Sequence, residues 1–211
     1  MPTPTEILQV LAAISNQQSK FAIFWHAVIA VTVIGILLGW RPTKRSGAVA
    51  LAIPLISVSA MAWAYRNPFN GLVFLLAAAA VVALGRRRPG EKVDRPPLWA
   101  AAAGLIMIVF GWVYPHFLQG GGWLQYLYRS PAGLIPCPTL SFVIGFLLLA
   151  NGFSSRGLSI LLGVLGLFYA LFGAFRLGVR LDLVLMLGAT ALLALAFGPG
   201  CSEAKPRPTS R

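Results

Sequence analysis

Acidic residues are scarce in this chain. The sequence of 211 residues has 5 of them against 17 lysines and arginines, and charged residues make up only 10% of the total. Soluble domains carry about a quarter charged residues, so this composition is not typical of a soluble protein. With so few carboxylates, a proton pump driven by intramembrane acids is also difficult to build.

Complete catalytic and cofactor motifs are absent as well. The sequence has no Walker loop, no arguable Ser-His-Asp set and no HExxH motif. The two cysteines, Cys137 and Cys201, have no zinc-type spacing, and the topology below places them on opposite sides of a membrane. We therefore expect no disulfide between them and no enzyme activity, and the cofactor is left unknown.

Long apolar runs are what the sequence does contain. Hydrophobic residues make up 58% of the chain, and the mean hydropathy is +0.79. A helix of about 20 residues crosses the hydrocarbon layer of about 30 Å, whereas a barrel would show short alternating segments. The sequence predicts an all-α fold, a polytopic transmembrane bundle of about seven spans. We expect these at residues 21–40, 47–65, 71–85 (or from 68), 98–114, 134–151, 157–175 and 181–197.

Basic residues predict the orientation of the bundle. With the N-terminus outside and the C-terminus inside, 12 of the 17 fall in cytoplasmic segments and 5 in outer ones, as the positive-inside rule requires. The net charge of +12 would suggest nucleic acid in a soluble protein. Because these residues lie between spans, we expect a lipid bilayer as the partner and no nucleic acid. The expected location is multi-pass, in a bacterial inner (plasma) membrane.

The two ends of the chain are predicted to lie outside the bundle. Residues 1–20 read as an amphipathic helix on the outer surface, with Thr3 as N-cap and Glu6 completing a capping box, and not as a cleaved signal peptide. The outer loop 115–133 should form a small cap with this helix. Residues 198–211 are expected to be a disordered cytoplasmic tail.

Cys137 is the strongest candidate for chemistry. Pro136 and Pro138 flank it at the start of the fifth span, with the hydroxyls of Thr139 and Ser141 close behind. Prolines remove backbone donors from a helix, and irregular backbone at membrane depth occurs only within protein or beside a cavity. One interpretation is a ligand-binding site for a soft metal or thiol-reactive ligand. The other is a kinked helix entrance with a buried, inert thiol.

Other polar residues near the outer end allow two interpretations each. His26 lies within the first span, and it would ligate a metal, relay a proton or bind haem with His116, or else make one hydrogen bond to another helix. His116 would otherwise be solvated. Asp182 would pair with Arg176 or Arg180 and join two helices, and an anion-binding entrance is the alternative.

Small residues repeat every four positions in the sixth span, at Gly166, Ala170 and Ala174. This spacing permits close helix approach. It serves packing within the bundle, or contact with a second copy or another membrane protein.

One element of the sequence resembles a known group of proteins. Ile135-Pro136-Cys137-Pro138-Thr139 before an apolar span resembles a family of uncharacterised bacterial multi-span membrane proteins with a domain of unknown function. The resemblance extends to segment 7–13, to Asn67-Pro68, and from segment 161–163 to Gly188. It implies a multi-span architecture and no particular activity.

Two classes of function remain open from the sequence. The first is a small permease or channel component for a metal ion or small solute, bound by Cys137 and His26. The second is a non-catalytic membrane scaffold or regulatory subunit of a larger complex. A permease predicts a water-accessible path past Cys137, and a scaffold predicts a dry bundle with a partner. A membrane enzyme acting on lipid or quinone would place several polar side chains in a lipid-open cleft.

Overall fold

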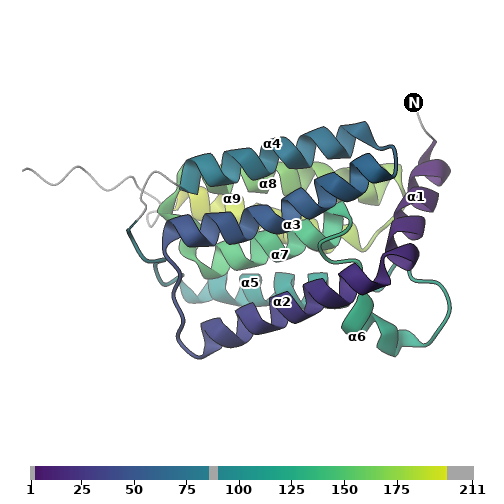
Figure 1. Ribbon diagram of the computed structural model, residues 1–211. Helices are drawn as coiled ribbons and strands as arrows, with labels where there is room; N and C mark the ends of the chain where they lie inside the picture. Colours follow the sequence, from purple (N-terminus) through teal and green to yellow (C-terminus); the bar gives the residue numbers. More distant parts are fainter. Residues whose placement is uncertain (1–2, 86–89, 199–211) are drawn as a thin grey trace, which may run out of the picture.

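The computed structural model describes residues 3–85 and 90–198, and within these ranges the fold is all-α. Seven helices lie side by side along one direction (Figure 1). They are α2 (Ser19–Leu37), α3 (Lys44–Ala64), α4 (Pro68–Gly85), α5 (Leu98–Val113), α7 (Pro136–Leu149), α8 (Arg156–Leu171) and α9 (Asp182–Phe197). The shorter turns η2 (Asn151–Ser154) and η3 (Phe172–Arg176, a π-helical turn) flank α8.

The bundle has two different ends. α1 (Pro4–Gln17) crosses one of them at a steep angle to the other helices (Figure 1). We call this the α1 end, and the long segment 114–135 and the first residue of α9 lie there as well. The opposite end holds Lys44, the first residue of α3, and we call it the Lys44 end.

The seven apolar segments expected from the sequence all form helices, within a few residues of the expected bounds. Of these, α2, α3, α4 and the continuous helix Arg156–Arg176 are long and apolar enough to cross a membrane. α5, α7 and α9 are apolar but have only 16, 14 and 16 residues. The 14 residues of α7 cover only about 21 Å. Because most of them are buried among other helices, α7 need not match the full thickness of a bilayer.

The N-terminal helix α1 forms as predicted, and it is hydrogen-bonded to the loop 115–133. The Thr3 hydroxyl accepts from the Glu6 N–H at 3.3 Å, and the Glu6 carboxylate accepts from the Thr3 N–H at 2.7 Å, which is a capping box. Near the other end of α1, the Asn16 side chain donates to the Phe117 carbonyl and accepts from the Gln119 N–H, each at 2.9 Å. The expected cap of α1 and the 115–133 loop, which includes η1 (Trp123–Gln125) and α6 (Tyr126–Arg129), is therefore present.

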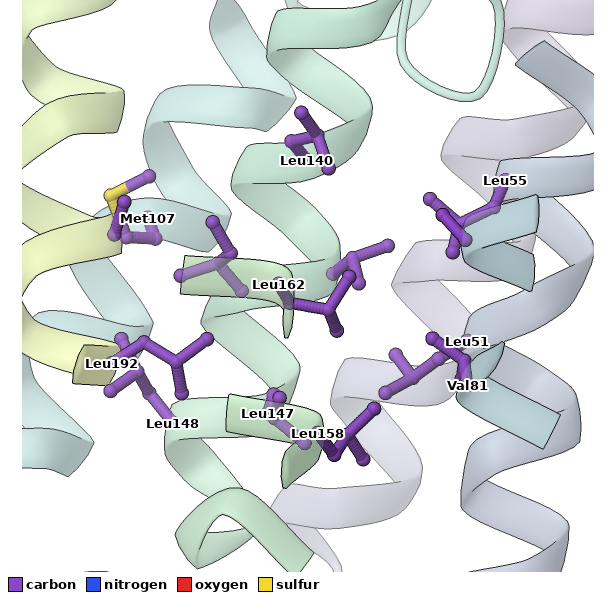
Figure 2. Close-up of a cluster of buried hydrophobic side chains, with 14 of the residues drawn as sticks. Leu51, Leu55, Val81, Met107, Leu140, Leu147, Leu148, Leu158, Leu162 and Leu192 are labelled. Atoms are coloured by element: carbon purple, nitrogen blue, oxygen red, sulfur yellow. The ribbon is translucent and has the colours of Figure 1, made fainter. Parts of the chain in front are cut away.

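The core is centred on α7. The closest helix pairs are α3 with α4, α8 with α9, and α5 with α7. In α5 and α7 the backbones approach so closely that a Cβ added to Gly104 would lie 2.8 Å from the Gly145 carbonyl, and the reverse contact is equally short, as is typical of membrane helix packing. Figure 2 shows the buried side chains that fill the centre, among them Leu51, Leu55, Val81, Met107, Leu140, Leu147, Leu148, Leu158, Leu162 and Leu192.

A short antiparallel pairing closes the Lys44 end. The Val93 N–H donates to the Pro42 carbonyl at 3.2 Å, and the Lys44 N–H donates to the Glu91 carbonyl at 2.8 Å. The Lys44 side chain is only 4% exposed, and its Nζ lies 2.8 Å from the Glu91 carboxylate and 3.3 Å from that of Asp94. The pairing therefore holds the segment that precedes α5 against the start of α3.

The described residues end at Gly198, so the rest of the predicted tail lies outside them. Cys201 belongs to this part of the chain, so the separation of the two cysteines stays a prediction. Seven spans and the N-out orientation likewise stay predictions, since helices of suitable length and composition do not by themselves locate a membrane.

Candidate functional site

The Cys137 element is the ordered beginning of a helix and not a break within one. α7 starts at Pro136, where a proline costs no hydrogen bond because the first helical N–H groups have no intrahelical partner. The Thr139 hydroxyl donates to the Ile135 carbonyl at 2.6 Å and accepts from the Gly133 N–H at 2.9 Å. The Ser141 hydroxyl donates to the Cys137 carbonyl at 2.9 Å. Both hydroxyls thus bond to the backbone of their own segment.

A buried carboxyl cluster joins three elements at the α1 end. Asp182, the first residue of α9, is only 2% exposed. Its Oδ1 accepts from the Tyr114 hydroxyl at 2.7 Å, and its Oδ2 accepts from the Cys137 thiol at 3.2 Å. We call Tyr114, Cys137 and Asp182 the Asp182 cluster. Gly173 lies directly against it, because a Cβ added there would overlap the Asp182 carboxylate.

In the structure, Asp182 contacts other partners than the two arginines expected from the sequence. Arg176 and Arg180 are both exposed, and among the described residues the salt bridges join only Lys44 to its two acids. The predicted ion pair was therefore wrong. Asp182 follows the turn at the α1 end with its side chain directed into the bundle, where a phenol and a thiol reach it, and the two guanidinium groups remain at the surface.

The His26 ring contacts main-chain carbonyls and not Cys137. It is 4% exposed, and its Nδ1 lies 2.9 Å from the Ala22 carbonyl and its Nε2 lies 3.1 Å from the Trp112 carbonyl. The ring also packs edge-to-face on Trp112. Both nitrogens therefore face main-chain oxygens, while the Cys137 thiol faces Asp182. These contacts join α2 to α5, the packing role that was one of the two sequence interpretations.

His116 lies in the loop and is half-buried, not fully solvated as the sequence suggested. Its ring packs against Phe117 with centroids 4.3 Å apart, and burial lowers the pKa of its imidazole. Within residues 3–85 and 90–198, no group of three or more His, Cys, Asp or Glu side chains is arranged to hold a metal ion.

An apolar groove of about 520 Å³ lies between α2 on one side and α3 and α7 on the other. Val28 and Ile29 of α2, Ile53 of α3 and Phe142 and Phe146 of α7 are among its lining residues. Lining residues on α2 run from Phe24 to Ile36, which corresponds to about 18 Å of helix. The groove is therefore long and narrow, and it follows the bundle axis.

The groove exists because α2 is attached to the bundle mainly at the α1 end. Its closest backbone contacts are with α6 and α1, and the Trp25 indole N–H donates to the Ser57 hydroxyl at 3.1 Å. Trp25 also lies against Gly133, where φ is +74° and a Cβ would overlap the indole ring. Further along α2, side chains from α3 and α7 form the opposite wall of a cavity.

Comparisons with known proteins do not add to this geometry. No family model, curated protein or solved structure matches the chain. The resemblance based on the Pro-Cys-Pro-Thr element therefore stays a prediction, and the candidate sites depend on the contacts described above.

The sequence did not reveal the groove or the role of Tyr114. Tyr114 is the last residue of the predicted span 98–114, and nothing in the sequence indicates that its hydroxyl turns inward. The groove depends on the rotation and tilt of α2 relative to α3 and α7. Because the surface of α2 is uniformly apolar, its sequence does not show which face lines a cavity. The polar lining residues of the groove are Thr32 and Thr139 along its length and Arg41, Asp94 and Arg95 at one end, and their positions in the sequence do not mark a groove.

Proposed function

We propose that this chain is an integral membrane protein of seven transmembrane helices that binds the hydrocarbon chain of a membrane lipid in the groove between α2 and α3–α7. The observation that carries the proposal is the groove itself, which has the volume of a ligand pocket and a mostly apolar lining. A compact solute would not use a cavity that extends for about 18 Å, whereas an extended chain would.

The topology in this proposal has the α1 end outside and the Lys44 end in the cytoplasm. The distribution of basic residues supports it, because 12 of 17 fall on the cytoplasmic side. Outward-facing side chains such as Val31, Leu76 and Leu187 are 71%, 59% and 67% exposed, as expected for helices that contact lipid.

Labelling of single cysteines tests the topology in a background that carries Cys137→Ser and Cys201→Ser, because Cys137 is only partly buried. Trp123→Cys, in the exposed loop at the α1 end, should react with an impermeant maleimide on intact cells. Lys92→Cys, exposed at the Lys44 end, should react only after permeabilisation. The reverse pattern would contradict the orientation, and reaction of both on intact cells would contradict the membrane span between them.

Native mass spectrometry of the protein released from detergent tests lipid binding. Ala50 lines the groove and its neighbour Val49 is exposed on the same helix without lining it, so Ala50→Trp and Val49→Trp are a matched pair. We expect wild type and Val49→Trp to retain lipid and Ala50→Trp to lose it. Equal retention by all three would contradict the proposal. Loss of a co-purifying protein from Ala50→Trp, with lipid unaffected, would instead assign the groove to a partner helix.

A permease for a metal ion or small solute stays a prediction. It predicts a water-accessible path past Cys137, and the groove does not include that residue. The geometry therefore supports a lipid chain better than a soluble ligand.

A further inference from the structure

The charged residues that line the groove all lie at one end of it. They are Arg41, Asp94 and Arg95, at the Lys44 end, where Trp40 also lines the groove. The rest of the lining is apolar except for Thr32, Thr139 and backbone. A ligand in the groove would therefore have a long apolar part and a polar group at one end only.

The charge at this mouth is positive. Asp94 is compensated, because the Lys44 ammonium lies 3.3 Å from its carboxylate and the Ser154 hydroxyl donates to it. Arg41 and Arg95 are exposed, and neither takes part in a salt bridge among the described residues. Two guanidinium groups at the mouth are thus available to an anion.

The two arginines flank a short backbone pairing. Thr43 and Lys92 form an antiparallel bridge, and Arg41 lies two residues before Thr43 and Arg95 three residues after Lys92. The segment is held by the hydrogen bonds of Val93 to Pro42 and of Lys44 to Glu91. The position of the arginines at the mouth is therefore set by ordered backbone on both sides.

We propose that the groove selects a lipid with an anionic phosphate headgroup, held by Arg41 and Arg95 while its chain lies between α2 and α7. This inference depends on the proposed lipid binding and adds the headgroup class and the leaflet. Guanidinium groups bind phosphate oxygens in pairs of parallel hydrogen bonds. Anionic lipids are enriched in the cytoplasmic leaflet, which is where the proposed topology puts the mouth, and Trp40 suits the headgroup level.

The test compares phosphatidylglycerol with phosphatidylcholine of identical chains, added to delipidated protein and measured by native mass spectrometry. Wild type should retain phosphatidylglycerol about tenfold better, as expected for charge-assisted hydrogen bonds. Arg41→Gln with Arg95→Gln should remove this preference. The matched control is Arg45→Gln, an exposed arginine near the same mouth that does not line the groove, and it should keep the preference.

The possible outcomes distinguish a failure of the headgroup inference from a failure of the proposed lipid binding. Equal retention of both lipids by wild type, with both lost in Ala50→Trp, would overturn the headgroup inference and leave chain binding intact. Retention of neither lipid would overturn both. If the double glutamine variant does not fold, Arg41→Lys with Arg95→Lys keeps the charge and loses the paired hydrogen bonds, so a reduced but remaining preference is expected. An unchanged preference in a folded double variant would assign the selectivity to other groups.

Discussion

At the scale of single residues, Asp182 is the most unusual group in the bundle. A carboxyl that is buried in an apolar helix bundle needs partners, because an unpaired polar group in an apolar medium is costly. Asp182 finds them in the hydroxyl of Tyr114 and the thiol of Cys137. Three helices, α5, α7 and α9, are thereby joined at the α1 end, and the cluster is best understood as a structural connection.

A double-mutant cycle tests this connection. Tyr114→Phe and Asp182→Asn should couple by about 1 kcal/mol, the magnitude expected for hydrogen bonds between membrane helices. The matched control is Arg180→Gln with Asp182→Asn, which should show no coupling because Arg180 is exposed and forms no described salt bridge. Unfolding in mixed micelles supplies the free energies. Coupling in the arginine pair and none in the tyrosine pair would favour the ion pair that the sequence suggested.

Gly173 gives a second prediction at the same scale. An added Cβ would overlap the Asp182 carboxylate, so Gly173→Ala should lower the free energy of unfolding by about 1–3 kcal/mol. Gly157→Ala, in the neighbouring helix α8, is the control, since its Cβ would meet only the Leu84 side chain at 3.7 Å. That variant should be neutral or slightly stabilising. Similar melting temperatures for the two variants would contradict the close contact.

At the scale of helices, the sequence predicted well where each helix lies along the chain, and poorly which side chains of different helices contact one another. Every apolar run forms a helix, which is the structure that the proposed bilayer location requires of such segments, and the capping box of α1 is a local signal that needs no tertiary information. The start of α7 at Pro136 also follows from local proline chemistry. The partner of Asp182 and the lean of α2 depend on helix rotations, which a uniformly apolar helix surface does not encode.

The capping box predicts a pH dependence for α1. Hydrogen bonds from Thr3 lower the pKa of the Glu6 carboxyl, so its contribution to helix stability is present above the pKa of the unfolded chain and is lost as the pH falls through the lowered value. Protection factors of amides in α1, measured from about pH 6 to about pH 3, should fall in wild type. In Glu6→Gln, which keeps a side-chain acceptor at this position, they should change much less, and parallel curves would contradict the assignment.

At the scale of the whole molecule, six helices of the bundle pack closely together, and the seventh, α2, packs closely only at one end. α3, α4, α5, α7, α8 and α9 pack closely around a common core. α2 is attached at the α1 end through Trp25 and His26, and beyond these contacts it forms one wall of the groove. This division leaves a closely packed body with the groove beside it, in which we propose that a lipid chain binds.

The most direct measurement of lipid binding is photo-crosslinking with a phosphatidylglycerol that carries a diazirine in the middle of one chain. Phe146 and Leu149 of α7 line the groove and are partly exposed, so a chain in the groove would contact them, whereas Val31 and Leu37 face outward on α2. We expect adducts on α7 residues in wild type and their loss in Ala50→Trp, with adducts on Val31 and Leu37 unchanged. Adducts confined to the outward-facing residues would contradict lipid binding in the groove.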